Sequence, residues 1–444
     1  MRNHSPFGAE GGEEMLELMI LGGNRQVGQM NAYALRDRRT GYSLVVDFGA
    51  EFAGENGEAN LLRIPDVSCL DPTKTAIVIS HAHYDHWLGL KVLASMPDWQ
   101  GCAEMKLVAP PFALGLIREQ LFNDEAAPCP AWELRKARSG ETVFRRGPFE
   151  VRWFSVIHST PQSCGIEVTW RESCHGPLRV VYTGDFVPAS WVNEVKKKPD
   201  VLLLDSTGSL HDGHTPLEEA CWPNLEGLVS RVGDDDCQRM IATLFSTNIS
   251  RLGYLVQCVR RHRLKYALLG RALQEAVDVA HRCRLEEAKV LNEYPPVSAH
   301  GADVLFVTGC QAEERSALWR MVYERNGYPE SLFEGDLLVN ASSCIPGNEK
   351  RVRELTERAL ARGAQVVLDV RGVKMNDDEV ERLLISPSGH ATLPDLLSVA
   401  KEIGAQTTIP VHGDQEHRSM LSAGLGKQGL KARMLEDGES WELS

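Results

Sequence analysis

The chain has 444 residues, 43% of them hydrophobic and 25% charged, with a formal net charge of −13 at pH 7. This length allows two hydrophobic cores, and the hydrophobic fraction excludes a chain that is disordered throughout. No run of about 18 apolar residues occurs, residues 1–14 lack the apolar stretch of a secretory signal, and the 11 cysteines show no paired spacing, so we expect a cytoplasmic protein without a membrane span.

Residues 15–209 read as a β-rich unit that follows a disordered leader at 1–14. Short apolar or alternating runs, bounded by glycine, proline or polar residues, are typical of strands. Such runs occur at 16–21, 42–47, 75–80, 106–109, 149–157, 178–183 and 201–205. Several of these expected strands end at residues that can bind a metal.

The strand expected at 75–80 runs directly into the hexapeptide His-Ala-His-Tyr-Asp-His at 81–86. His81 and His83 alternate along an extended segment and can point the same way, whereas Asp85 and His86 fall in the following turn and reach a second point. Imidazole nitrogens and carboxylate oxygens suit Zn²⁺ or, with lower affinity, Mn²⁺ and other divalent ions. Because no Cys-x-x-Cys pair is nearby, the hexapeptide predicts an open, catalytic metal site rather than a closed structural zinc.

Three more candidate ligands follow strands in the same way. His158 follows 151–157, Asp185 follows the run at 178–184, and His412 follows 407–411. Taken singly, each would more often be a hydrogen-bonded structural histidine or a turn aspartate. Their repeated position after an apolar strand, together with the hexapeptide, predicts a site for two metals.

From residue 210 helical periods become longer and alternate with strands at 240–245, 266–269, 304–307 and 337–339. This order is typical of an α/β domain with its own parallel sheet. We expect this domain to be inserted at 210–363. The strands expected at 365–370, 384–386 and 407–411 then return the chain to the first unit, at 364–444, so that His412 completes the metal site.

The ligand series resembles the metallo-β-lactamase fold, an αβ/βα sandwich with two metals at its rim. A second series of motifs resembles the ribonuclease J branch of the β-CASP nucleases and extends from about Leu21 to Gly413. Its members are Phe245-Ser-Thr-Asn248, Gly270-Arg271, Thr308-Gly-Cys-Gln311, Ser342-Ser-Cys-Ile-Pro-Gly-Asn-Glu349, Ser388-Gly-His390-Ala391 and Pro410-Val-His412-Gly413. The resemblance implies an α/β chain, with a metallo-β-lactamase sandwich and an inserted β-CASP α/β domain.

The chain departs from the family pattern in the region expected to hold nucleic acid. The family reads Thr-Gly-Ser-Gln-Gly-Glu where this chain has Thr-Gly-Cys-Gln-Ala-Glu at 308–313, and it has serine at the position of Ala272. These departures concern the substrate more than the chemistry. The resemblance also implies a short form without the family's C-terminal domain, which leaves homo-oligomerisation open.

Chemical reasoning and the resemblance together suggest how the ligands divide between two ions, Zn²⁺ or Mn²⁺. One ion takes His81, His83 and His158, the other takes Asp85, His86 and His412, and Asp185 bridges them. Two divalent ions about 3.5–4 Å apart can share a hydroxide and neutralise a phosphate during in-line attack.

The catalytic residues expected besides the metal ligand Asp85 are His390 and Asp205. His390, which follows a glycine, can donate a proton or a hydrogen bond to the phosphate or the leaving oxygen. Asp205 ends an apolar strand and can orient His390. Phosphodiester hydrolysis is therefore the expected reaction.

Candidate substrate contacts are small or cationic groups suited to phosphate oxygens. They are Ser246, Asn248, Arg271, Ser342, Ser343, Ser388 and Gly389. By resemblance, a pocket that contains Ser388 holds a terminal 5′ monophosphate of single-stranded RNA and favours stepwise 5′-to-3′ cleavage. An endonuclease mode and a preference for DNA stay open.

Two other classes of function stay open. One is a hydrolase of a small ester, thioester or phosphodiester, and the other is an idle RNA-binding or scaffold protein. The net charge of −13 is unusual for a nucleic-acid binder. Basic clusters occur at 196–198, 260–265 and 350–353, and each reads as a solvated helix face.

Overall fold

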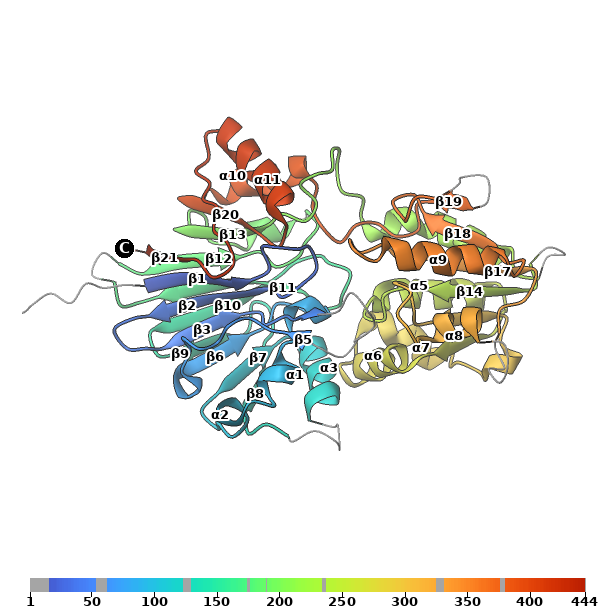
Figure 1. Cartoon of the computed structure of the whole chain (residues 1–444), viewed down its shortest axis with the longest axis horizontal. Helices are drawn as coiled ribbons and strands as arrows, with labels where there is room; N and C mark the ends of the chain where they lie inside the picture. Colours follow the sequence, from blue (N-terminus) through green and yellow to red (C-terminus); the bar gives the residue numbers. More distant parts are fainter. Residues whose placement is uncertain are drawn as a thin grey trace, which may run out of the picture.

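A computed structural model of the chain describes residues 16–52, 62–122, 129–173, 176–188, 190–233, 237–324, 331–375 and 380–443. The leader expected at 1–14 lies outside these residues. Figure 1 shows two lobes side by side, one built on two facing sheets and one on a third sheet. Among the helices in the described residues, none combines the length and apolarity needed to cross a membrane.

The first lobe contains two sheets that pack face to face. The strand order of the first sheet is β21 (Ser440–Leu443), β1 (Leu16–Gly22), β2 (Ala32–Asp37), β3 (Ser43–Val46), β6 (Thr75–Val78), β7 (Lys106–Ala109) and β8 (Glu133–Lys136). That of the second is β20 (Thr407–Val411), β13 (Val201–Asp205), β12 (Leu178–Tyr182), β11 (Cys164–Trp170), β10 (Phe149–Ser155) and β9 (Val143–Arg146). A two-stranded ribbon, β4 (Glu51–Phe52) and β5 (Leu62–Arg63), stands apart from both.

The alternation of residues along the strands explains how these sheets form layers. In β1, Leu18 faces the second sheet and joins a core with Val78 and Trp153, whereas its neighbour Met19 joins the core on the other face. Helices cover both outer faces: α1 (Leu90–Leu93), α2 (Pro97–Gln100) and α3 (Pro111–Leu121) on the first sheet, and α10 (Leu393–Ile403) and α11 (Gln415–Lys427) on the second. The expected αβ/βα sandwich is confirmed.

The second lobe is an α/β domain whose sheet is entirely parallel, as expected. Its strand order is β15 (Tyr266–Leu269), β16 (Val304–Val307), β14 (Arg239–Thr243), β17 (Asp336–Asn340), β18 (Gln365–Asp369) and β19 (Glu381–Leu383). One face packs on α4 (Trp222–Ser230), α5 (Ile249–Arg261), α6 (Arg271–Arg282) and α7 (Lys289–Glu293). The other packs on α8 (Ala317–Tyr323) and α9 (Glu349–Leu360).

The inserted domain does not end at residue 363, as the sequence predicted, because the next strand belongs to its sheet. The strand expected at 365–370 forms β18, which pairs with β17 in the third sheet, and β19 extends the same sheet. The residues expected as a strand at 384–386 are irregular. A buried apolar strand can complete either a sandwich or a parallel sheet, so its sequence alone did not reveal its sheet. The chain leaves the second lobe after Leu383.

The two lobes share a helix contact in which α3 packs against α6 (Figure 1). Gly115 of α3 makes this close approach possible, because a Cβ built on it lies only 2.4 Å from Cγ1 of the buried Val279. Gly115→Ala is expected to lower the free energy of unfolding by about 1 kcal/mol, since overpacking of roughly 1–3 kcal/mol exceeds the gain of about 1 kcal/mol in helix propensity.

Urea unfolding of this variant against Gly227→Ala is the matched measurement. Gly227 lies in α4 and nothing lies within 4 Å of a Cβ built there, so alanine should stabilise that position. Equal stabilisation by the two changes would show that the α3–α6 contact is not tightly packed.

Candidate metal centre

The polar residues of the site converge because several strands end at one edge of the first lobe. β12, β13 and β20 run parallel, and β10 runs in the same direction through its antiparallel neighbour β11. Their carboxyl ends lead to Asp185, Asp205, His412 and His158, respectively. The hexapeptide leaves the end of β6 in the facing sheet and forms a short 3-10 helix over Tyr84–His86. Both sheets therefore contribute to the site.

His81, His83, His158 and Asp185 form the first group of ligand atoms, all within 4.8 Å of one another. Nδ1 of His83 lies 3.2 Å from Nε2 of His81 and 3.0 Å from Nε2 of His158. Oδ2 of Asp185 lies 3.6 Å from Nε2 of His81 and 3.8 Å from Nε2 of His158. The structure thus brings together the set that the sequence suggested for one ion.

Asp85, His86, Asp185 and His412 form the second group. Oδ2 of Asp85 lies 3.0 Å from Nε2 of His412 and 3.4 Å from Nε2 of His86. Oδ2 of Asp185 lies 3.3 Å from Nε2 of His86. Asp185 is therefore common to both groups, in the position of a bridge.

The other ring nitrogen of each histidine is held by a fixed partner, which determines which nitrogen faces the site. Four Nδ1–H groups donate outward: His81 to Ser80 Oγ at 2.9 Å, His86 to Asp47 Oδ2 at 2.7 Å, His158 to the Gly389 carbonyl at 2.8 Å and His412 to Thr207 Oγ1 at 2.5 Å. His83 is turned the other way, with Nε2 3.3 Å from Ser159 Oγ. The remaining ring nitrogen of each histidine therefore faces its group.

This donor set fits two divalent cations. Ring nitrogens 3.0 Å and 3.2 Å apart repel one another unless a proton or a metal cation lies between them, and a cation would satisfy both contacts at once. Oδ1 of Asp185 is buried and has no hydrogen-bond partner among the described residues. Nitrogen and carboxylate ligands without thiolates suit Zn²⁺ and Mn²⁺.

The electrostatics of the two groups differ. Burial lowers the pKa of His83 to about 4, and burial with the nearby His83 lowers that of His158 to about 3, so both are neutral ligands. Burial also opposes the charged form of His412, but Asp185, Asp205 and Asp85 outweigh it and raise its pKa to about 10. Protons balance the carboxylates of the second group, and cations would displace them on binding.

Asp47 and Ser80 support the site but were missed in the sequence. Asp47 accepts hydrogen bonds from His86 Nδ1 at 2.7 Å and from the Ser80 hydroxyl at 2.7 Å, and Ser80 in turn holds His81. The signal was present, because Asp47 ends the strand expected at 42–47 as Asp205 ends its own. Asp47 and His412 both have φ of +58°, a strained conformation that is typical of functional sites.

His390 lies beside both groups. Its Nδ1–H donates to Oδ2 of Asp205 at 2.8 Å, and its Nε2 lies 3.9 Å from Oδ2 of Asp185. Burial alone would lower the pKa of His390, but Asp205 and Asp185 raise it above its ordinary value. The side chain is 20% exposed, so its outer nitrogen can reach a bound molecule.

Three of the expected substrate contacts line a cleft of about 610 Å³ next to the metal centre. They are Asn248, Ser388 and Gly389, and His158 lines the same cleft. Nδ2 of the buried Asn248 has no hydrogen-bond partner among the described residues. A Cβ on Gly389 would lie 2.5 Å from His158 Cε1, so only glycine allows this approach.

The other expected contacts lie outside the lining of that cleft. Ser342 and Ser343 surround Gln311, whose Nε2 donates to the Ser343 carbonyl at 2.8 Å. Arg271 begins α6, with its side chain 82% exposed and its Nε 2.5 Å from Oε1 of Glu275. Ser246 is half-buried after β14.

Ala312 replaces the family's glycine at a position with φ of +56°. Ala312→Gly is expected to raise the free energy of unfolding by up to about 1 kcal/mol, because relief of left-handed strain exceeds the entropy cost of glycine. Thermal unfolding against Ala359→Gly in α9, which should destabilise the protein by about 1 kcal/mol, tests this. Destabilisation of both variants by the same amount would exclude strain at Ala312.

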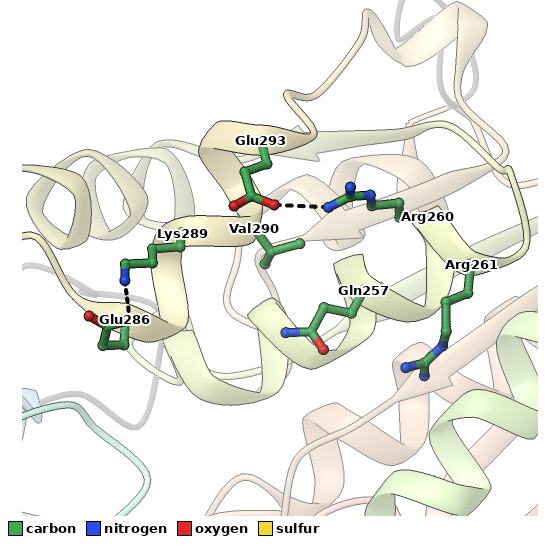
Figure 2. Close-up of a pocket in the computed structure, with 7 residues that line it drawn as sticks. All are labelled: Gln257, Arg260, Arg261, Glu286, Lys289, Val290 and Glu293. Carbon is green, nitrogen blue, oxygen red and sulfur yellow. Dashed lines mark hydrogen bonds and ion pairs between the residues drawn. The ribbon is translucent and has the colours of Figure 1, made fainter.

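A second hollow, of about 510 Å³, lies on α5 and α7, and none of its lining residues is a proposed metal ligand (Figure 2). Its charges are paired, with Arg260 Nη1 2.9 Å from Glu293 Oε2 and Lys289 paired with Glu286. The basic cluster at 260–265 therefore contributes balanced surface charge here, and it forms no concentrated cationic site.

Residues 45–222 match the β-lactamase superfamily domain, and residues 237–359 match the β-CASP domain of ribonuclease J. A ribonuclease J from Sinorhizobium meliloti is 26% identical over 97% of this chain and 75% of its own length. The chain belongs to the ribonuclease J family. A ribonuclease J from Helicobacter pylori, 26% identical, matches 90% of this chain, which spans 57% of that relative.

Among solved structures, a protein of unknown function from Enterococcus faecalis is similar to this ribonuclease J family member in fold. Its TM-score is 0.64 at 15% sequence identity, and the match covers 97% of this chain and all of the other. The similarity extends over both lobes and concerns the fold alone.

Proposed function

We propose that this protein is a metal-dependent ribonuclease that hydrolyses phosphodiester bonds of single-stranded RNA. The observation that carries the proposal is the pair of buried His/Asp groups that share Asp185, with His390 beside them. This centre lies where the β-lactamase unit meets the β-CASP unit, since the ring of His83 is 6.2 Å from that of Phe245. A 5′-to-3′ exonuclease is the leading mode, with endonucleolytic cleavage as the alternative.

The ligand assignment follows the two groups. His81, His83 and His158 would hold one ion, Asp85, His86 and His412 would hold the other, and Asp185 would contribute to both. When bound, two divalent ions lower the pKa of an attacking water and neutralise charge that develops on the phosphate.

His390 supplies the hydrogen-bond donor that the phosphate requires. Its Nδ1–H is fixed by Asp205, which leaves Nε2 to donate to a phosphate oxygen or to the leaving oxygen. The Asp205 carboxylate raises the pKa of His390, which favours the protonated, hydrogen-bond-donating ring. Asp205 acts through His390 and is a positioning residue.

The cleft beside His158 is proposed to hold the 5′-terminal nucleotide. Asn248 Nδ2 is an uncommitted donor there, and Ser388 and Gly389 lie at the same wall. A phosphate at this wall would place the next phosphodiester near the metal centre. Ser246, Arg271, Ser342 and Ser343 are proposed to contact RNA outside the cleft.

The test is cleavage of single-stranded RNA with a 5′ monophosphate, triphosphate or hydroxyl, with added Zn²⁺ or Mn²⁺ and product lengths resolved. Mononucleotides released only from monophosphorylated RNA would establish a 5′ exonuclease that recognises its end. Internal fragments from all three RNAs would establish an endonuclease, and DNA of the same sequence tests the sugar preference. No cleavage of any RNA by protein with two bound ions would favour a small-molecule hydrolase.

A further inference from the structure

Tyr84 is an exposed aromatic side chain between two proposed metal ligands, His83 and Asp85. It is 42% exposed, whereas the neighbouring Trp87 is fully buried. The two rings pack edge to face, with centroids 5.2 Å apart at 62°, and the Trp87 indole N–H donates to the Ala82 carbonyl at 3.0 Å. Tyr84 therefore rests on a buried side chain that directly follows the hexapeptide.

The segment that carries Tyr84 meets the second lobe, because the ring of the neighbouring His83 lies 6.2 Å from that of Phe245. Burial raises the pKa of the Tyr84 hydroxyl, Glu275 and Glu313 raise it further, and Arg271 lowers it. Glu275 and Arg271 belong to the first turns of α6, and Glu313 follows β16. Tyr84 is not part of the lining of the cleft that contains Ser388. A contact of Tyr84 with RNA would therefore lie outside that cleft.

Nothing in the described residues explains this exposed ring by packing or hydrogen bonding alone. No hydrogen bond among them reaches the Tyr84 hydroxyl, and the edge contact with Trp87 leaves ring surface accessible. An aromatic face held next to a phosphate-cleaving centre is suited to stack on a nucleobase, and such stacking accepts any base. An arginine nearby can contact the phosphate backbone of the same strand.

We propose that Tyr84 is the stacking platform for one RNA base close to the cleaved phosphodiester. Arg271 contacts the backbone of that strand. The inference rests on the proposed ribonuclease function and adds a base-binding residue outside the expected phosphate contacts. It gives this acidic protein a source of RNA affinity that needs little positive charge.

A double-mutant cycle tests the contact. The wild type, Tyr84→Leu and Tyr84→Phe cleave a set of RNAs in which a single abasic residue is moved along the positions around the cleaved bond. At one position the abasic residue should raise KM of the wild type about tenfold, as loss of one stacked base does. Tyr84→Leu should raise KM about tenfold on intact RNA, with a smaller change in kcat. An abasic residue at that position should then cause no further rise in KM of this variant.

Tyr84→Phe keeps the ring and should restore the sensitivity to that abasic position. Phe333→Leu, at an aromatic residue that is 56% exposed and precedes β17, is the control that should behave as the wild type. Metal content of each variant, measured by mass spectrometry, should stay at the wild-type value. If the abasic residue raised KM of Tyr84→Leu as much as KM of the wild type at every position, the stacking would be refuted. A Tyr84→Phe variant with the KM of Tyr84→Leu would refute it too. If the wild type cleaves no RNA, the ribonuclease function itself fails, and the stacking falls with it.

Discussion

Replacing Asp185 by asparagine should remove tight binding of at least one metal ion and lower RNA cleavage about a thousandfold or more. Asp185 is the only residue shared by all three potential metal-binding groups in the described chain. Its Oδ2 lies within 3.9 Å of a ring nitrogen of His86, His81, His158, His412 and His390. An amide has the same shape but no charge, so it bridges two cations poorly.

The measurements are metal content by mass spectrometry and kcat/KM on a single-stranded RNA. Asp200→Asn is the matched control, because Asp200 precedes β13 at the end opposite the metal centre and accepts a hydrogen bond from the Arg179 backbone at 2.8 Å. We expect Asp200→Asn to bind metal and cleave RNA as the wild type does. An Asp185→Asn variant with two bound ions and full activity would refute the bridging role.

Much of this site was predictable because local sequence pattern determines it. The side chains of the hexapeptide point in two directions. His81 and His83 join the first group of ligand atoms, and Asp85 and His86 join the second. Asp185, Asp205 and His412 were recognisable since each follows an apolar strand, and parallel strands bring their carboxyl ends to one edge. Hydrophobic periodicity and strand ends depend on residues that are close together in the chain, so they can be recognised from the sequence alone.

Long-range partners were not predictable in the same way. The strand at 365–370 was assigned to the wrong sheet, because a buried apolar strand carries no mark of its neighbour. Asp47 ends an expected strand, but its partner His86 lies 39 positions away in the chain, so the sequence did not reveal their contact. The contacts of Ser342 and Ser343 with Gln311, about 30 positions earlier in the chain, were likewise not visible in the sequence.

His390→Ala should lower kcat about a hundredfold to ten-thousandfold while both metal ions stay bound, as expected for loss of a general acid or hydrogen-bond donor. Asp205→Asn should lower kcat about tenfold to a hundredfold, because the ring loses the charged partner at 2.8 Å that orients it. Single-turnover cleavage with saturating enzyme separates this chemical step from RNA binding. A rise in KM with unchanged kcat would assign His390 to binding alone.

The double variant decides whether Asp205 acts through His390. If it does, Asp205→Asn should have little further effect on kcat once His390 is alanine, since residues that work as a unit are not additive. Asp205 also lies 3.5 Å from Nδ1 of His412, through which it could orient a metal ligand instead. In that case the reductions in kcat of the two single variants would multiply in the double variant, and the metal affinity of Asp205→Asn would fall. The coupling energy together with metal content therefore separates positioning of the donor from positioning of the metal.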